Sequence, residues 1–191
     1  MRDDLIRWEQ RYRDRAAQVE EPASQFLQQC LPLIPRGRIL DVAAGDGRNA
    51  VHLARHGRAV EAIDISFTGL CRLRALAARE RLHVDAIQAD LDDYPLPRSR
   101  YAGIVNIRFL QRGLFASLKA ALQPRGVILV ETFLIDQRSL GHPTNPRHLL
   151  NHGELRDLLQ GLTILFADEG RFDTESGPAF LARAAARRDR D

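Results

Sequence analysis

Short apolar runs alternate with longer amphipathic segments along the chain from residue 38 onward. The short runs have the alternating, β-branched character of strands, and the longer ones repeat apolar residues at helical spacing. Strands are predicted over 38–43, 59–65, 83–89, 101–107, 126–132 and 162–167, and helices over 47–56, 67–82, 111–122 and 152–160. The run at 178–185 does not distinguish helix from strand.

Strands separated by segments of helix length predict βαβ units, and hence an α/β fold with a parallel sheet covered by helices on both faces. No internal repeat or low-complexity linker interrupts the chain, so a single domain is expected over 1–191, with a helical cap at 1–37 and a Rossmann-like core at 38–191. The polar segment 136–151 contains two prolines. Loops of this length are usually either functional covers or disordered segments.

Composition places the chain among globular proteins, with 191 residues of which 45% are hydrophobic and 28% charged. It contains no apolar run of about 18 residues and no signal-peptide pattern, so we expect no membrane span. Two cysteines are too few for a disulfide framework, which favours a cytoplasmic location. The cysteines lack metal-ligand spacing, and His52 and His56, spaced i, i+4, have no third ligand nearby, so no metal site is expected. The net charge of +3 comes from interspersed acids and bases, so a nucleic acid partner is not expected.

Polar residues follow the predicted strands at the edge where an open α/β sheet binds its ligands. Asp41, Asp64, Asp90 and Asn106 stand at four successive strand ends. A half-buried strand does not by itself explain such a series, so we expect the ligand site at this edge.

The turn after the first strand, DVAAGDGRNA at 41–50, suits two ligand classes. Gly45 and Gly47 permit a tight turn and close backbone approach, and with Ala50 they match the dinucleotide fingerprint, with Asp64 19 residues beyond Gly45. An NAD(P)-binding oxidoreductase is therefore one interpretation of this turn.

Charge favours the other ligand class. Asp41 and Asp46 would repel a pyrophosphate, by about 4 kcal/mol per close pair at an effective dielectric near 20. S-adenosylmethionine carries an ammonium and a sulfonium, a ribose diol and an adenine, and Asp41, Asp64 and Asp90 can serve its amino acid, ribose and adenine in turn. The sequence therefore favours a methyl donor over a dinucleotide.

The chain also resembles the class I S-adenosylmethionine-dependent methyltransferases, and within them the tellurite-resistance and thiopurine methyltransferase-like group. The resemblance covers nearly the whole chain in order, through ILDVAAGDGRN at 39–49, VEAIDIS at 60–66, IQADLDDYPLP at 87–97, NIRFLQRGLF at 106–115 and LQPRGVILVETF at 122–133. It implies a seven-stranded sheet whose last strand is antiparallel, S-adenosyl-L-methionine as cofactor, and methyl transfer as the activity.

The resemblance also implies roles for individual residues. Asp41 would face the methionine amino group, Asp64 the ribose, and Asp90 the adenine amino group. Gly45 and Gly47 would contact the cofactor through their backbones, and Arg48 or Asn49 would lie near the methionine carboxylate. Ile65 would pack on the adenine, with Leu91 beside Asp90. Asn106 and Ile107 would line the region near the methyl group that is transferred. Many relatives have glycine at the position of Ala43, where alanine narrows the turn.

An N-terminal element, Trp8-x-x-Arg11-Tyr12, is similar to one that folds over the cofactor in relatives. Trp8 and Tyr12 are spaced i, i+4, so they can equally dock the helix on the core. Both interpretations place these residues on one helix face.

The acceptor is less clearly indicated. Methyl transfer from a sulfonium needs positioning and exclusion of water, and a soft or anionic acceptor such as a thiol, a thiopurine or a tellurite-like or selenite-like ion needs no general base, so no catalytic residue is assigned. Arg108 and Arg112 would share a helix face and hold an anionic acceptor, or form a surface pair; His142 in the long loop is the other substrate candidate. A methyltransferase for RNA or protein remains an alternative.

Overall fold

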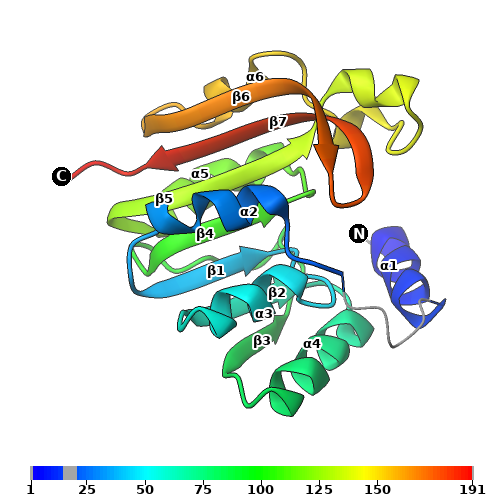
Figure 1. Ribbon diagram of the computed structural model, residues 1–191, viewed down its shortest axis with the longest axis vertical. Coiled ribbons are helices and arrows are strands. Elements are labelled where there is room, and N and C mark those ends of the chain that lie inside the picture. Colours follow the sequence, from blue (N-terminus) through cyan, green and yellow to red (C-terminus); the bar gives the residue numbers. More distant parts are fainter. Residues whose placement is uncertain (1, 15–20, 191) are drawn as a thin grey trace.

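The computed structural model describes residues 2–14 and 21–190, which form a twisted sheet with helices on both faces (Figure 1). Its strands are β1 (Arg38–Val42), β2 (Ala59–Asp64), β3 (Val84–Gln88), β4 (Tyr101–Ile107), β5 (Leu122–Phe133), β6 (Thr163–Thr174) and β7 (Gly177–Arg187). Its helices are α1 (Arg2–Asp14), α2 (Gln25–Cys30), α3 (Arg48–Arg55), α4 (Phe67–Arg79), α5 (Phe115–Ala121) and α6 (Glu154–Leu158), with short 3₁₀ turns at Leu31–Leu33, Arg112–Leu114, Ile135–Ser139 and Pro146–His148.

The seven strands lie in the order β3-β2-β1-β4-β5-β7-β6. Strands β1 to β5 pair in parallel, whereas β7 is antiparallel to both β5 and β6. This confirms the sheet implied by the family resemblance, and it resolves the run at 178–185 as a strand. A dinucleotide-binding sheet of order 3-2-1-4-5-6 has no antiparallel strand inserted before its edge, so the topology disfavours that alternative.

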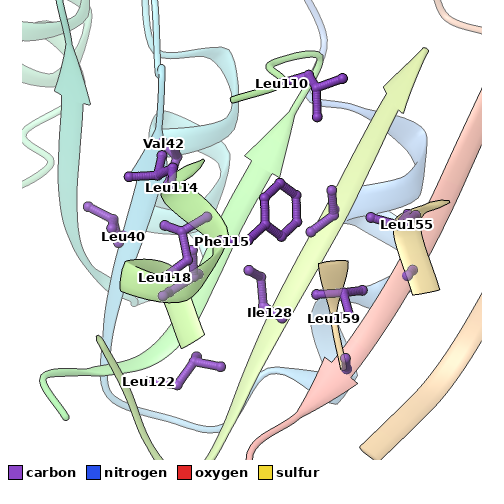
Figure 2. Packing of buried hydrophobic residues seen from close by; sticks show 14 of the residues in the cluster. Leu40, Val42, Leu110, Leu114, Phe115, Leu118, Leu122, Ile128, Leu155 and Leu159 are labelled. Carbon is purple, nitrogen blue, oxygen red and sulfur yellow. The ribbon is translucent and has the colours of Figure 1, made fainter. Parts of the chain in front are cut away.

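Two apolar layers cover the sheet. On one face α2, α3 and α4 pack over residues such as Ile39, Val60 and Leu129. Figure 2 shows part of the other layer, in which Phe115 and Leu118 of α5 lie against Leu40 and Ile128 of the sheet. Burial on both faces explains why the parallel strands are continuous apolar runs rather than strictly alternating ones.

The covering layers leave the carboxyl ends of the parallel strands at one edge. Figure 1 shows α1 beside this edge, together with the turn of the β6–β7 hairpin. No helix in the described ranges is both long and apolar enough to cross a membrane. The segment 136–151 is closed at its base, because Ile135 N donates to Leu150 O at 2.8 Å and Leu150 N donates to Phe133 O at 2.8 Å.

Candidate functional site

The carboxylate of Asp41 is buried at the end of β1. It is 1% exposed, and its Oδ2 atom has no hydrogen-bond partner among the described residues. Burial raises the pKa of Asp41 to about 7, and the negative charge of Asp64 adds to this, whereas the positive charge of Arg48 acts against it. A buried carboxylate without a hydrogen-bonded cation is suited to an incoming positive charge.

The turn after β1 brings the backbone close to other elements. Gly45 and Gly47 have φ of 60° and 88°, in the left-handed region that glycine adopts without strain. A Cβ atom on Gly45 would lie 2.1 Å from the hydroxyl oxygen of Tyr12, and one on Gly47 would lie 2.2 Å from Leu73 Cδ1. A side chain at either position would be strained by the backbone conformation and would collide with Tyr12 or Leu73 as they now lie.

Ala43 also has a positive φ, of 52°. An alanine in this region is strained by its Cβ atom. The glycine that the family resemblance implies at this position would be free of this strain.

Asp64 joins two turns of the site. Its Oδ2 accepts from Gly45 N and its Oδ1 accepts from Ser66 N, each at 2.7 Å. Burial raises the pKa of Asp64, and these two hydrogen bonds oppose the rise. Each carboxylate oxygen has two lone pairs, so both can still accept from a ligand hydroxyl.

Helix α1 lies against the same turn. Trp8 and Tyr12 stack with ring centroids 6.0 Å apart, and the Arg11 guanidinium lies 5.0 Å from the Trp8 ring centroid. Tyr12 approaches both Gly45 and Gly69, so the predicted shared helix face is present and packs on the glycine turn.

Glu9 holds α1 in place, a role that the sequence did not suggest. Its Oε1 accepts from Ser66 Oγ at 3.0 Å and from Thr68 N at 3.1 Å, and its Oε2 accepts from Thr68 Oγ1. These bonds lower the pKa of Glu9 although burial acts to raise it. The carboxylate caps the N-terminus of α4, 57 or more residues away, so no local pattern could have indicated it.

The first turn of α3 supplies Arg48 and Asn49. Arg48 Nη1 lies 3.0 Å from Glu175 Oε1, in the β6–β7 turn. Asn49 is buried and its Oδ1 accepts from Ser24 N at 3.0 Å. Arg48, whose positive charge acts on the Asp41 carboxylate, is therefore tied to the hairpin, whereas Asn49 fixes the segment before α2.

The ends of β2 and β3 lie side by side, since Ala89 N donates to Asp64 O at 3.0 Å. Ile65 and Asp90 are half-buried and Leu91 is buried beside this junction. Asp90 Oδ1 accepts from Asp92 N at 2.9 Å, which orders the turn that follows.

The end of β4 presents an unusual buried amide. Asn106 is 1% exposed, and neither its Oδ1 nor its Nδ2 has a hydrogen-bond partner in the described structure. Thr132 Oγ1, on the neighbouring strand β5, is also buried without a partner. Buried polar groups are normally satisfied, so these atoms mark a position where a ligand can bind. Ile107 is buried next to Asn106.

The prediction that Arg108 and Arg112 share a helix face is wrong. Arg108 directly follows β4 in a left-handed conformation, with φ of 62°, and Arg112 begins a 3₁₀ turn. Arg112 donates to Glu154 and to the carbonyl oxygens of Arg147 and Leu149, so it anchors the end of the loop at 136–151. His142 has an exposed side chain in that loop, between its two 3₁₀ turns.

These residues fit S-adenosyl-L-methionine on structural grounds. Asp41 Oδ2, which no described residue pairs with, is an anionic acceptor for an ammonium, Asp64 retains lone pairs for a diol, and Gly45 and Gly47 keep the backbone turn narrow. A diphosphate in the same place would meet the Asp41 carboxylate.

Comparisons with known proteins agree with this fit. Residues 39–126 match a family described as "Methyltransferase domain". Over 62 residues the chain is 42% identical to the 23S rRNA (uracil(1939)-C(5))-methyltransferase RlmD of Halomonas elongata, covering 32% of this chain and 13% of that protein. The chain thus spans about an eighth of the length of this relative.

Solved structures share the fold over most of the chain. TehB from Haemophilus influenzae is 19% identical with a TM-score of 0.73, covering 86% of this chain and 61% of that one. An S-adenosylmethionine-dependent methyltransferase from Mesorhizobium loti is 22% identical with a TM-score of 0.69, covering 85% and 95%. A protein studied in the conversion of a disulfide bond into a thioacetal group during echinomycin biosynthesis is 19% identical with a TM-score of 0.78, covering 97% and 92%.

The fold is that of the class I methyltransferases. Within this fold, residues 39–126 carry the match to the methyltransferase domain family. The comparisons do not single out the tellurite-resistance or thiopurine group, because TehB is one of many neighbours at low identity.

Proposed function

We propose that this protein is an S-adenosyl-L-methionine-dependent methyltransferase that methylates a small acceptor by in-line displacement. The observation that carries the proposal is the buried Asp41 carboxylate, whose Oδ2 lacks a partner within residues 2–14 and 21–190 and which lies beside a glycine turn at the ligand-binding edge of the sheet. Asp41 would hold the ammonium of the methionine, and its negative charge would then be neutralised.

The other cofactor contacts follow the order of the strand ends. Arg48 would meet the methionine carboxylate and Asp64 the ribose, with the adenine between Ile65 and the Asp90–Leu91 turn. Gly45 and Gly47 would approach through their backbones, Asn49 would support the α3 turn, and Ala43, Asn106 and Ile107 would line the methyl side. Trp8, Arg11 and Tyr12 would cover the cofactor from α1.

The protein would act mainly by orientation and by exclusion of water. The bound sulfonium supplies a methyl group that is already activated for displacement. Asn106 and Ile107 would fix the space where the acceptor atom approaches in line, and α1 would keep water from the turn. A thiol, a thiopurine or a tellurite-like or selenite-like ion needs no general base once ionised, so we assign no catalytic residue.

We extend the proposal to domain organisation. Residues 38–191 would form the catalytic core, and 1–37 a helical cap that completes the site without being a separate domain. The docking of α1 through Glu9 and Tyr12 supports this arrangement.

Titration calorimetry tests the proposal. We expect S-adenosylmethionine to bind with 1:1 stoichiometry and more tightly than NAD, and Asp41→Asn to weaken its binding by about tenfold or more at pH 8. Asp157→Asn, an exposed change on α6, is the matched control. Tighter binding of NAD would reverse the assignment, and failure of the protein to form S-adenosylhomocysteine with any thiol, thiopurine, tellurite or selenite would remove the proposed acceptor class.

A nucleic acid acceptor is the second candidate, because the 62-residue match is to an rRNA methyltransferase. Transfer of a radioactive methyl group to total RNA, lost on ribonuclease treatment, would favour it over a small acceptor.

A further inference from the structure

Two guanidinium groups share one buried carboxylate beside the end of β4. Glu131, on β5, is 1% exposed, and its two oxygens lie 3.0 Å from Arg108 Nε and 2.7 Å from Arg183 Nε. The trio therefore carries one positive charge in excess. Glu175 also acts electrostatically on Arg108, but it is hydrogen-bonded to Arg48 at 3.0 Å.

Arg108 is the member of the trio with a donor to spare. Its Nη2 atom is buried and has no hydrogen-bond partner in the described ranges, while the side chain as a whole is 17% exposed. Arg183, by contrast, is enclosed, with Phe172 at 4.0 Å and Phe26 at 5.8 Å from its guanidinium carbon to the ring centroids. An unpaired buried donor is costly, so a ligand that accepts from it would gain affinity.

The Arg108 guanidinium is also held in one orientation. Glu131 fixes its Nε edge, and the Phe133 ring centroid lies 4.7 Å from its central carbon. The backbone at Arg108 is left-handed, with φ of 62°, and its N–H donates to Glu131 O at 2.7 Å. Strained backbone of this kind at the mouth of a site is frequently retained for function.

We infer that Arg108 is a specificity-determining residue that binds an anionic group, of carboxylate type, on the methyl acceptor. The inference rests on the proposed function. With Nε bonded to Glu131, the edge carrying Nη2 remains for the oxyanion, and planar carboxylates match a guanidinium edge well. Arg112 does not share the role, because Glu154 and two backbone carbonyl oxygens occupy it.

The transfer itself is balanced without a further reagent. For a thiol acceptor, the proton passes to water, the new S–CH₃ bond forms as the sulfonium C–S bond breaks, and S-adenosylhomocysteine leaves. Arg108 would hold the acceptor through an anionic group separate from the methylated sulfur and take no part in bond making.

The test compares two thiols that differ in one charge, 2-mercaptobenzoate and thiophenol, with wild type, Arg108→Gln and Arg108→Lys. Arg112→Gln is the matched control, a neighbouring arginine already paired within the fold. Calorimetry measures the affinity for S-adenosylmethionine in each variant, and 2-mercaptobenzoate is also titrated into protein saturated with S-adenosylhomocysteine, which does not depend on turnover.

We expect wild type to bind 2-mercaptobenzoate and to prefer it to thiophenol in kcat/KM. Arg108→Gln should reduce that preference by about tenfold or more, with the affinity for S-adenosylmethionine unchanged, and Arg108→Lys should retain part of it. Arg112→Gln should keep the preference.

Three results would overturn the inference: no binding of 2-mercaptobenzoate to wild type, an unchanged preference in Arg108→Gln, or a loss of S-adenosylmethionine affinity there, which would assign Arg108 to the cofactor carboxylate. If Arg108→Gln reduced the binding of a short oligoribonucleotide by an equal factor, Arg108 would be assigned to a phosphodiester, and a small carboxylate would be rejected as its ligand. Failure of wild type to bind S-adenosylmethionine would instead refute the proposed function.

Discussion

Replacing Asp41 with asparagine should stabilise the free protein while it damages the cofactor site. The carboxyl has a folded pKa of about 7 against an ordinary value of 3.8, a rise of about 3 units. At about 1.4 kcal/mol per unit, ionised Asp41 costs the folded state about 4 kcal/mol above pH 7. Asparagine removes that charge but leaves a buried N–H without a partner at the Oδ2 position, which costs about 1–3 kcal/mol. The net gain at pH 8 should be about 1–3 kcal/mol.

The pH dependence has a definite sign. Between the two pKa values the folded state keeps the Asp41 proton that the unfolded chain has released, so the free energy of unfolding of wild type falls as pH rises through this window. Below pH 3.8 the carboxyl is neutral in both states and contributes no such loss. The advantage of Asp41→Asn should therefore grow by about 3 kcal/mol between pH 5 and pH 8.

Urea unfolding at pH 5 and pH 8 measures this difference, with Asp157→Asn as the exposed control that should show no such trend. Calorimetry on the same proteins measures the cofactor. Wild type should lose about tenfold in S-adenosylmethionine affinity between pH 8 and pH 6, because the ammonium requires ionised Asp41, and the variant should show no comparable loss. A stability difference that does not change with pH would refute the assignment of a raised pKa to Asp41.

Two further predictions concern the turn and the cap. Ala43→Gly should leave stability unchanged or raise it by up to about 1 kcal/mol, because it relieves a left-handed alanine, whereas Ala44→Gly, at a position without positive φ, should lower it by about 0.5–1 kcal/mol in urea unfolding. Equal losses in both would argue against strain. Glu9→Gln should loosen α1, so that emission of Trp8, the only tryptophan, shifts to the red and is more readily quenched by acrylamide. The exposed change Gln10→Ala on the same helix should not do so, and an unshifted emission in Glu9→Gln would argue against this attachment.

The alternation of apolar runs predicted β1 to β5 and their parallel pairing, because strands buried on both faces need continuous apolar sequence. The last strand was harder to predict. Residues 178–185 include four alanines, which favour a helix, and pairing with β5 and β6 made the segment a strand. Local propensity is weak where neighbouring strands supply the hydrogen bonds.

Sequence also determined which chemistry gathers at the edge of the sheet. Glycines and carboxylates that follow the strands can be identified from the sequence alone, because the parallel topology places the C-terminal ends of these strands at one edge of the sheet. What tertiary structure alone decided is how each group is paired. Glu9 meets Ser66 57 residues away, and Glu131 meets Arg108 and Arg183 at separations of 23 and 52. Helical spacing wrongly linked Arg108 to Arg112, because the partner of a charged group depends on its distance in the folded chain and not on sequence spacing. Burial then determines whether that group is paired, has a shifted pKa or is left to bind a ligand.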